Sequence, residues 1–126
     1  MAEGLRGLRI YQLAEDLSDE IWAGVSTWKP FARDTVGRQL VEAADSIGGN
    51  IAEGYDRYHY KDNRQFQFYA RGSLEETGHW LRRATRRKLI SEARYNDLMR
   101  KVADLAPQLN AYIRTLERKA KVERAR

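Results

Sequence analysis

Apolar residues recur every three to four positions along most of the chain, which is the spacing of one face of an α-helix. Four such stripes follow one another, separated by short polar or Pro-containing connections. The stripes predict helices over residues 7–28, from 36 to about 54–57, over 61–87, and from Ser91 to Leu116.

Four amphipathic helices joined by short connections favour an all-α, antiparallel up-down-up-down four-helix bundle. No internal repeat or second domain is visible, and we expect one domain over residues 1–118. Pro30 disfavours helical geometry at the preceding residue, so residues 29–33 are predicted to be a connection. Asp34 is the expected N-cap of the second helix.

The last helix carries two further signals. Ser91 is its expected N-cap, and Pro107 inside its apolar pattern predicts a kink. The apolar stripe stops after Leu116, so residues 119–126 are predicted to be a basic, disordered tail.

The composition fits a folded protein and excludes several classes. Three Trp, seven Tyr and three Phe in 126 residues are too many for an intrinsically disordered chain. The absence of Cys removes disulfides, thiol catalysis and Cys-ligated metal centres. No apolar run approaches the roughly 20 residues of a membrane span, and the start lacks a signal peptide's apolar stretch. We therefore expect a cytoplasmic protein without membrane contact.

Catalytic and metal-binding motifs are not recognisable. The chain has two His, and His79 supplies one Glu-x-x-His pair with Glu76, whereas a di-metal site in a helical bundle needs two such pairs. No nucleophile elbow or phosphate-binding loop is present. We expect no metal, no cofactor and no enzymatic activity.

One face of the second predicted helix carries small and polar residues. Asn and Gly each cost a helix about 0.5–1 kcal/mol relative to Ala, so a contact must offset them. Gly54 would either end the helix or allow close packing, and a hairpin turning near residue 59 would set Ser46 beside Gly72 and Ser73. A polar seam that fixes helix register is the favoured interpretation, and a ligand or nucleic-acid site is the alternative. The predicted seam comprises Ser46, Asn50, Glu53, Gly54, Arg57, Gly72 and Ser73.

The same segment carries a family resemblance. Ser-Ile-x-x-Asn-Ile-Ala-Glu-Gly-x-x-Arg at 46–57, followed by Ala-Arg-Gly-Ser-Leu-Glu-Glu at 70–76, resembles the bacterial four-helix-bundle family encoded in intervening sequences of 23S ribosomal RNA genes. The resemblance extends over residues 5–116 and implies a pentameric barrel of bundles. The family's relatives include the accessory protein of diversity-generating retroelements, which binds a reverse transcriptase and nucleic acid. Val41-Glu42 replaces a basic pair common in the family, so no nucleic-acid contact is carried over to that position.

Charge is distributed unevenly along the chain. Residues 1–56 hold 5 Lys/Arg against 10 Asp/Glu, and residues 57–126 hold 18 against 8. Such a split is typical of proteins that bind a polyanion or that self-associate through complementary charge, and an ordinary solvated helix surface would also produce it.

The densest basic group lies at the end of the third predicted helix. Cations there complement the helix dipole, but one or two would suffice and five repel one another. A phosphate backbone would relieve this repulsion. We therefore predict that RNA or DNA is bound by charge and shape at Arg82, Arg83, Arg86, Arg87 and Lys88.

Aromatic residues gather around the second predicted turn, interleaved with cations. They would either stack on single-stranded bases or anchor a subunit interface, where Tyr and Arg are enriched. The interface is the favoured interpretation, and it predicts a homo-oligomer. Its candidate residues are Tyr55, Tyr58, Tyr60 and Phe68.

Two function classes follow from these observations. In the first, the protein is a non-enzymatic oligomeric bundle that binds nucleic acid as an accessory factor. In the alternative, it is a structural or adaptor oligomer that docks a partner protein, such as a reverse transcriptase, and has no direct nucleic-acid role.

Overall fold

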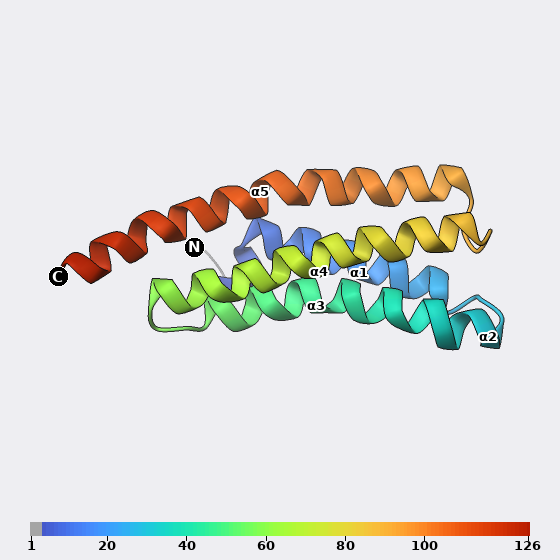
Figure 1. Cartoon of the computed structure of the whole chain (residues 1–126), viewed down its shortest axis with the longest axis horizontal. Coiled ribbons are helices and arrows are strands. Elements are labelled where there is room, and N and C mark those ends of the chain that lie inside the picture. Colours follow the sequence, from blue (N-terminus) through green and yellow to red (C-terminus); the bar gives the residue numbers. More distant parts are fainter. Residues whose placement is uncertain (1–3) are drawn as a thin grey trace.

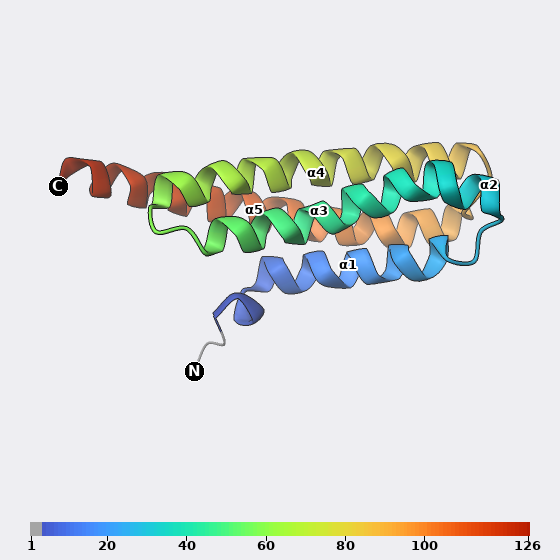
Figure 2. The ribbon, with the colours of Figure 1, turned by 90° about the horizontal axis from the view of Figure 1, so that it is seen from below.

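The computed structural model describes residues 4–126, and within them it contains four long helices and no strand. The chain runs up, down, up and down through these helices (Figures 1 and 2). Helix α3 packs against α1 and α4, and α5 packs against α4 and α1, which closes the bundle. A 3₁₀ turn over Gly4–Gly7 precedes the long helices, which are α1 (Arg9–Val25), α3 (Arg38–Tyr55), α4 (Tyr60–Arg86) and α5 (Glu92–Ala125).

The predicted apolar stripes form the core of the bundle. Burying them removes aliphatic side chains from water, which is the main force that holds such helices together. Helix α1 buries one residue per turn, whereas Leu13 within it and Trp28 just after it are only partly buried. The largest fully buried apolar side chains of the bundle are Leu17, Leu40, Ile47, Ile51, Leu81, Leu105, Leu109 and Leu116.

The second long helix begins earlier than predicted. Helix α2 (Pro30–Ala32) and a π-helical turn (Arg33–Gly37) lead directly into α3, so residues 29–33 are not a simple connection. Asp34 is not an N-cap and pairs instead with Arg33 at 3.0 Å. The physical reason is that Pro suits the first position of a helix, where its missing N–H would have no partner.

The last helix is longer than predicted. Ser91 caps it as expected, because its hydroxyl oxygen accepts the backbone N–H of Arg94 at 3.1 Å. Pro107 lies inside α5, and Figure 1 shows the axis of α5 changing direction between its orange and red halves. Residues 119–126 were predicted to be a disordered tail, but the helix continues to Ala125 and projects past the turn between α3 and α4 (Figures 1 and 2).

Contacts with that turn explain the extension of α5. Ala120 is buried, and His59 Nδ1 lies 3.4 Å from Glu123 Oε1. The ammonium group of Lys119 lies over the ring of Tyr60, 5.3 Å from its centroid. The end of α5 therefore has packing partners that an apolar stripe alone does not reveal.

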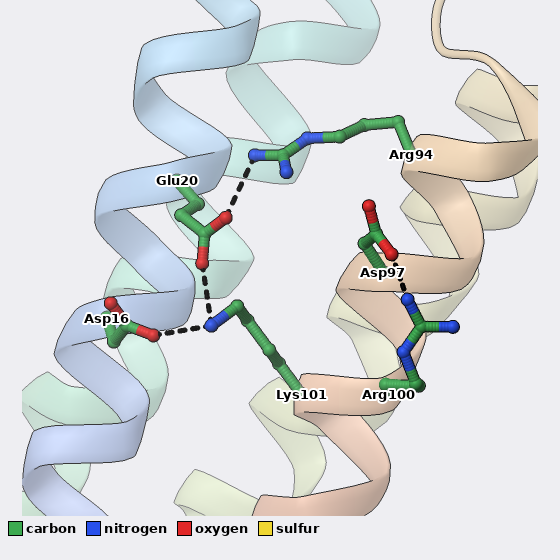
Figure 3. A network of polar contacts seen from close by, with 6 residues as sticks. All are labelled: Asp16, Glu20, Arg94, Asp97, Arg100 and Lys101. Atoms are coloured by element: carbon green, nitrogen blue, oxygen red, sulfur yellow. Dashed lines mark hydrogen bonds and ion pairs between the residues drawn. The ribbon is translucent and has the colours of Figure 1, made fainter.

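An ion-pair network joins α1 to α5 (Figure 3). Lys101 Nζ lies 2.7 Å from Asp16 Oδ2 and 2.8 Å from Glu20 Oε2, and these hydrogen bonds raise the pKa of Lys101. Glu20 Oε1 also accepts from Arg94 at 3.1 Å. Such partly exposed pairs each contribute only about 0–1 kcal/mol. They show that part of the opposite charge of the two chain halves is matched within one molecule.

Helices α3 and α4 approach each other closely at Gly54, next to a buried group of polar side chains. A Cβ at Gly54 would lie 2.7 Å from both Asn63 Oδ1 and Gln67 Nε2. Gln67 is fully buried, and its amide donates to Asn63 Oδ1 at 2.8 Å and to the carbonyl of Ile51 at 3.2 Å. The Asn63 amide in turn donates to the hydroxyl of Tyr112 at 3.1 Å, which ties α4 to α5. Close packing, rather than helix termination, is therefore the role of Gly54.

This Gly54 cluster, consisting of Gly54, Asn63, Gln67 and Tyr112, replaces most of the predicted seam. Of the predicted cross-helix contacts, Asn50 reaches the hydroxyl of Ser73 at 3.5 Å. Ser46, predicted beside Gly72 and Ser73, is exposed and bonds to the carbonyl of Glu42 in its own helix.

The other predicted seam residues form no hydrogen bond between α3 and α4, although the guanidinium of Arg57 lies over the ring of Phe66 on α4, 4.6 Å from its centroid. Glu53 and Arg57 pair with each other on the exposed surface of α3, at 3.3 Å. Gly72 is exposed and has open space where a side chain would be. Small or polar residue type therefore did not suffice to identify the buried positions of this seam.

We predict that Gly54→Ala lowers the free energy of unfolding by about 1–3 kcal/mol, because overpacking outweighs the better helix propensity of Ala. The neighbouring glycine, Gly49, is the matched control, since a Cβ there meets nothing within 4 Å. Gly49→Ala should raise the free energy of unfolding by about 0.5–1 kcal/mol. Urea denaturation of both variants measures the two effects, and equal stabilisation by both would contradict the close contact at Gly54.

Candidate nucleic-acid interface

The predicted basic group lies at the end of the bundle that holds the connection from α4 to α5. Four of its cations line an open groove of about 840 Å³, together with the first turn of α5. We call this feature the basic groove. Its basic residues are Arg82, Arg83, Arg86 and Lys88, and Leu89, Ile90, Ser91, Glu92 and Tyr95 are among its other lining residues.

The fifth cation of the group points to a different place. Arg87 lines a second, neighbouring hollow of about 750 Å³, whose other lining residues include Phe31, Trp80 and Leu89. We call this feature the apolar hollow. Leu89 lines both the groove and the hollow, so the two are adjacent. The sequence therefore identified one basic cluster, which the helix divides between two surface sites.

The charge of the basic group is not matched by neighbouring carboxylates. Within residues 4–126, none of the five cations forms an ion pair, whereas Arg94 and Lys101 nearby on α5 do. Glu92 brings one carboxylate to the rim of the basic groove, against four cations. The partial negative charge at the C-terminus of α4 offsets a fraction of this excess. The groove thus has a net positive potential that favours an anionic ligand.

The backbone that presents these cations adopts a defined helix ending. The N–H of Leu89 bonds to the carbonyl of Ala84 at 2.8 Å, and the N–H of Lys88 bonds to that of Thr85 at 3.0 Å. These two bonds are the Schellman motif, whose left-handed position usually holds Gly. Here Lys88 occupies it with φ of 62°, at a cost of about 1–2 kcal/mol for a residue with a Cβ. This backbone conformation places Lys88 at the edge of the basic groove.

The aromatic residues proposed for a subunit interface are at the opposite end of the bundle. Tyr58 in the turn between α3 and α4 is 90% exposed, and Tyr55 and Tyr60 are also exposed. Phe68 differs, because it is partly buried against the core and the guanidinium of Arg71 lies 4.9 Å from its ring centroid. Three of the four candidates are therefore available on the surface of one chain.

Two sets of residues were missed by the sequence interpretation. Asn63 and Gln67 occupy core positions on α4, on the same helix face as Ala70 and Leu74. Their helical spacing to these two apolar residues was the signal that could have identified them. Phe31 is 83% exposed and lines the same hollow as Arg87 of the basic group. The periodicity of the sequence indicates neither its exposure nor this position. The aromatic that directly follows Pro30 was the only available signal.

Other kinds of site find little support in the geometry. In the part of the chain that the structure describes, no three His, Asp or Glu side chains come together in a way that would hold a metal ion. His59 is paired with Glu123, and His79 packs against the ring of Trp80. No helix between residues 4 and 126 is both long and apolar enough to cross a membrane.

Comparison with known proteins places the chain in a family. A crystal structure of a protein of unknown function from the S23 ribosomal protein family of Bacteroides thetaiotaomicron VPI-5482 is similar, with a TM-score of 0.66. The match has 21% sequence identity and covers 79% of this chain and 97% of that chain, so it shows a shared fold. No curated protein matches the chain. Residues 6–111 match the family model described as 23S rRNA-intervening sequence protein, and the protein therefore belongs to that family.

Proposed function

We propose that the protein is a non-enzymatic accessory factor that binds nucleic acid through the basic groove. The observation that carries the proposal is the excess charge of the groove, where four cations face one carboxylate and none is ion-paired within residues 4–126. A phosphate backbone supplies closely spaced negative charges and releases condensed counterions when cations replace them. The family's association with 23S rRNA genes supports a polynucleotide over a small anion.

Binding of this kind depends on charge and shape rather than on sequence. The groove is open and lies at a helix end, and its polar groups are mostly long, flexible cations. Such side chains contact phosphates and carry no information about base identity. We therefore expect RNA and DNA of different sequences to bind with similar affinity and with strong dependence on salt.

We further propose that the chain works as a homo-oligomer. The exposed tyrosines Tyr55, Tyr58 and Tyr60 support a subunit contact at the end opposite the basic groove, since Tyr is enriched in interfaces. A closed ring would repeat the basic groove in every subunit and raise the apparent affinity for a long strand. The number five comes from the family resemblance alone.

Light scattering tests the assembly. A ring of five should give about five times the chain mass of 14.7 kDa at micromolar concentration. Tyr58→Ala should lower that mass or weaken the assembly without changing helix content. A mass near that of one chain for the wild-type protein would refute the oligomer.

The basic groove is tested by replacing its four cations, Arg82, Arg83, Arg86 and Lys88, together with Gln. Gln retains good helix propensity, so the bundle should remain folded while nucleic-acid binding is lost. For the wild type, four neutralised phosphates predict a log–log salt slope of roughly −3 on single strands. Fluorescence anisotropy with labelled RNA and DNA across a salt series measures both quantities.

A matched variant controls for net charge. Arg114, Arg118, Lys121 and Arg124 are exposed cations of α5 that line neither the basic groove nor the apolar hollow. Replacing these four with Gln removes the same charge and should weaken binding far less. Equal binding by wild type and groove variant, or an affinity indifferent to salt, would contradict the proposal. Absence of nucleic-acid binding by the wild type would favour an adaptor that docks a partner protein such as a reverse transcriptase.

A further inference from the structure

The apolar hollow has the volume and the mixed apolar and cationic lining of a ligand site. Its volume of about 750 Å³ lies in the range of known small-ligand sites, about 300–1,000 Å³. Phe31, Val36, Trp80 and Leu89 contribute apolar surface, and Arg38 and Arg87 bring two cations to it against one carboxylate, that of Asp34. An apolar recess next to positive charge is suited to a ligand that has a flat, weakly polar part attached to an anion.

Phe31 is the most unusual residue of this hollow. It is 83% exposed and sits directly after Pro30, at the start of the continuous helical segment that leads into α3. Two other rings are covered by cations of their own chain, Phe66 by Arg57 at 4.6 Å and Tyr60 by Lys119 at 5.3 Å. In the described part of the chain, Phe31 has no aromatic or cationic partner of this kind.

The hollow and the basic groove form one continuous surface. Leu89 lines both, and the consecutive residues Arg86 and Arg87 each face one of them. A strand whose phosphates lie along the basic groove would thus have its next bases beside Phe31. Stacking on an exposed aromatic ring is the usual way in which proteins hold an unpaired base without reading its identity.

We propose that the protein prefers single-stranded nucleic acid, with one unstacked base seated in the apolar hollow against Phe31 while the flanking phosphates occupy the basic groove. This inference rests on the proposed function and adds the class of strand to it. A duplex keeps its bases stacked inside, so it reaches the groove through its phosphates alone. The hollow therefore contributes to the binding of single strands and not to that of duplexes.

The experiment compares three fluorescent probes of equal length by anisotropy at fixed salt. They are a mixed-sequence single-stranded DNA, the same backbone with abasic residues, and the same strand annealed to its complement. Phe31→Ala should weaken binding of the first probe by at least about five-fold, the effect of losing one base–aromatic stack. It should leave the affinities for the abasic strand and the duplex unchanged.

Trp22→Ala is the matched control. Trp22 is another exposed aromatic, 61% accessible on α1, and it lines neither the basic groove nor the apolar hollow. This variant should bind all three probes as the wild type does. Circular dichroism melts of both variants verify that the bundle is folded.

Each result separates the inference from the proposed function. If Phe31→Ala binds the single strand as tightly as the wild type does, while the groove variant no longer binds it, the base site is overturned and the basic groove is retained. Equal weakening on all three probes would also overturn it, because the effect would not involve a base. A lower oligomer mass for Phe31→Ala with unchanged binding would assign the hollow to a second copy. Absence of binding to any probe by the wild type would overturn both proposals.

Discussion

The missing side chain of Gly54 is the constraint on which the arrangement of the helices depends. It allows α3 to approach α4 so closely that the amides of Asn63 and Gln67 occupy the space where a Cβ would be. These amides then bond to the backbone of α3 and to Tyr112 of α5, so one contact sets the register of three helices. Burial raises the pKa of the Tyr112 phenol, which keeps this group neutral and the cluster uncharged. A buried group of hydrogen-bonded amides of this kind specifies one alignment where apolar side chains alone would tolerate several, although Gln67 Oε1 accepts no hydrogen bond from the described residues.

Because α4 is one continuous helix, the register set at the Gly54 cluster also fixes which side chains face the solvent at its C-terminal end. From Asn63 to Arg86 an α-helix rises by roughly 35 Å, so the cations lie far from the Gly54 cluster. Between the two ends, the network of Asp16, Glu20 and Lys101 matches acid on α1 with base on α5. The cations at the end of α4 have no such match within residues 4–126. The Gly54 cluster and the basic groove thus lie at opposite ends of the bundle, and we assign the proposed binding to the end that holds the groove, although α5 also carries exposed cations at the other end.

The sequence predicted the parts of this structure that depend on local pattern. Helix type and the Ser91 cap follow from periodicity and capping chemistry. For Gly54 the sequence left two roles open, helix termination and close packing, and the structure shows the second. The sequence did not predict that a helix starts at Pro30, because proline has two opposing effects. It disfavours helical geometry at the residue before it, which predicts a connection, but it suits the first position of a helix, which is where the structure places it.

Features that depend on tertiary packing were less accessible. The end of α5 is helical because it packs on the turn between α3 and α4, which no local pattern records. The division of the basic group between groove and hollow depends on side-chain direction at a helix ending whose left-handed residue is Lys88 rather than Gly. The exposure of Phe31 likewise follows from how α2 joins the bundle. Spacing in a sequence shows which residues share a helix face, but it does not show what lies opposite them.

Hydrogen–deuterium exchange of the full-length protein, with and without a single-stranded RNA, tests the division between the two ends most directly. The account predicts that amides around Gly54 and Gln67 exchange slowly in the free protein and are unchanged by RNA. Amides of residues 84–92, which form the end of α4 and the start of α5, should exchange more slowly when RNA is bound. Protection confined to the turn between α3 and α4, or no change at residues 84–92 under conditions where RNA is bound, would contradict it.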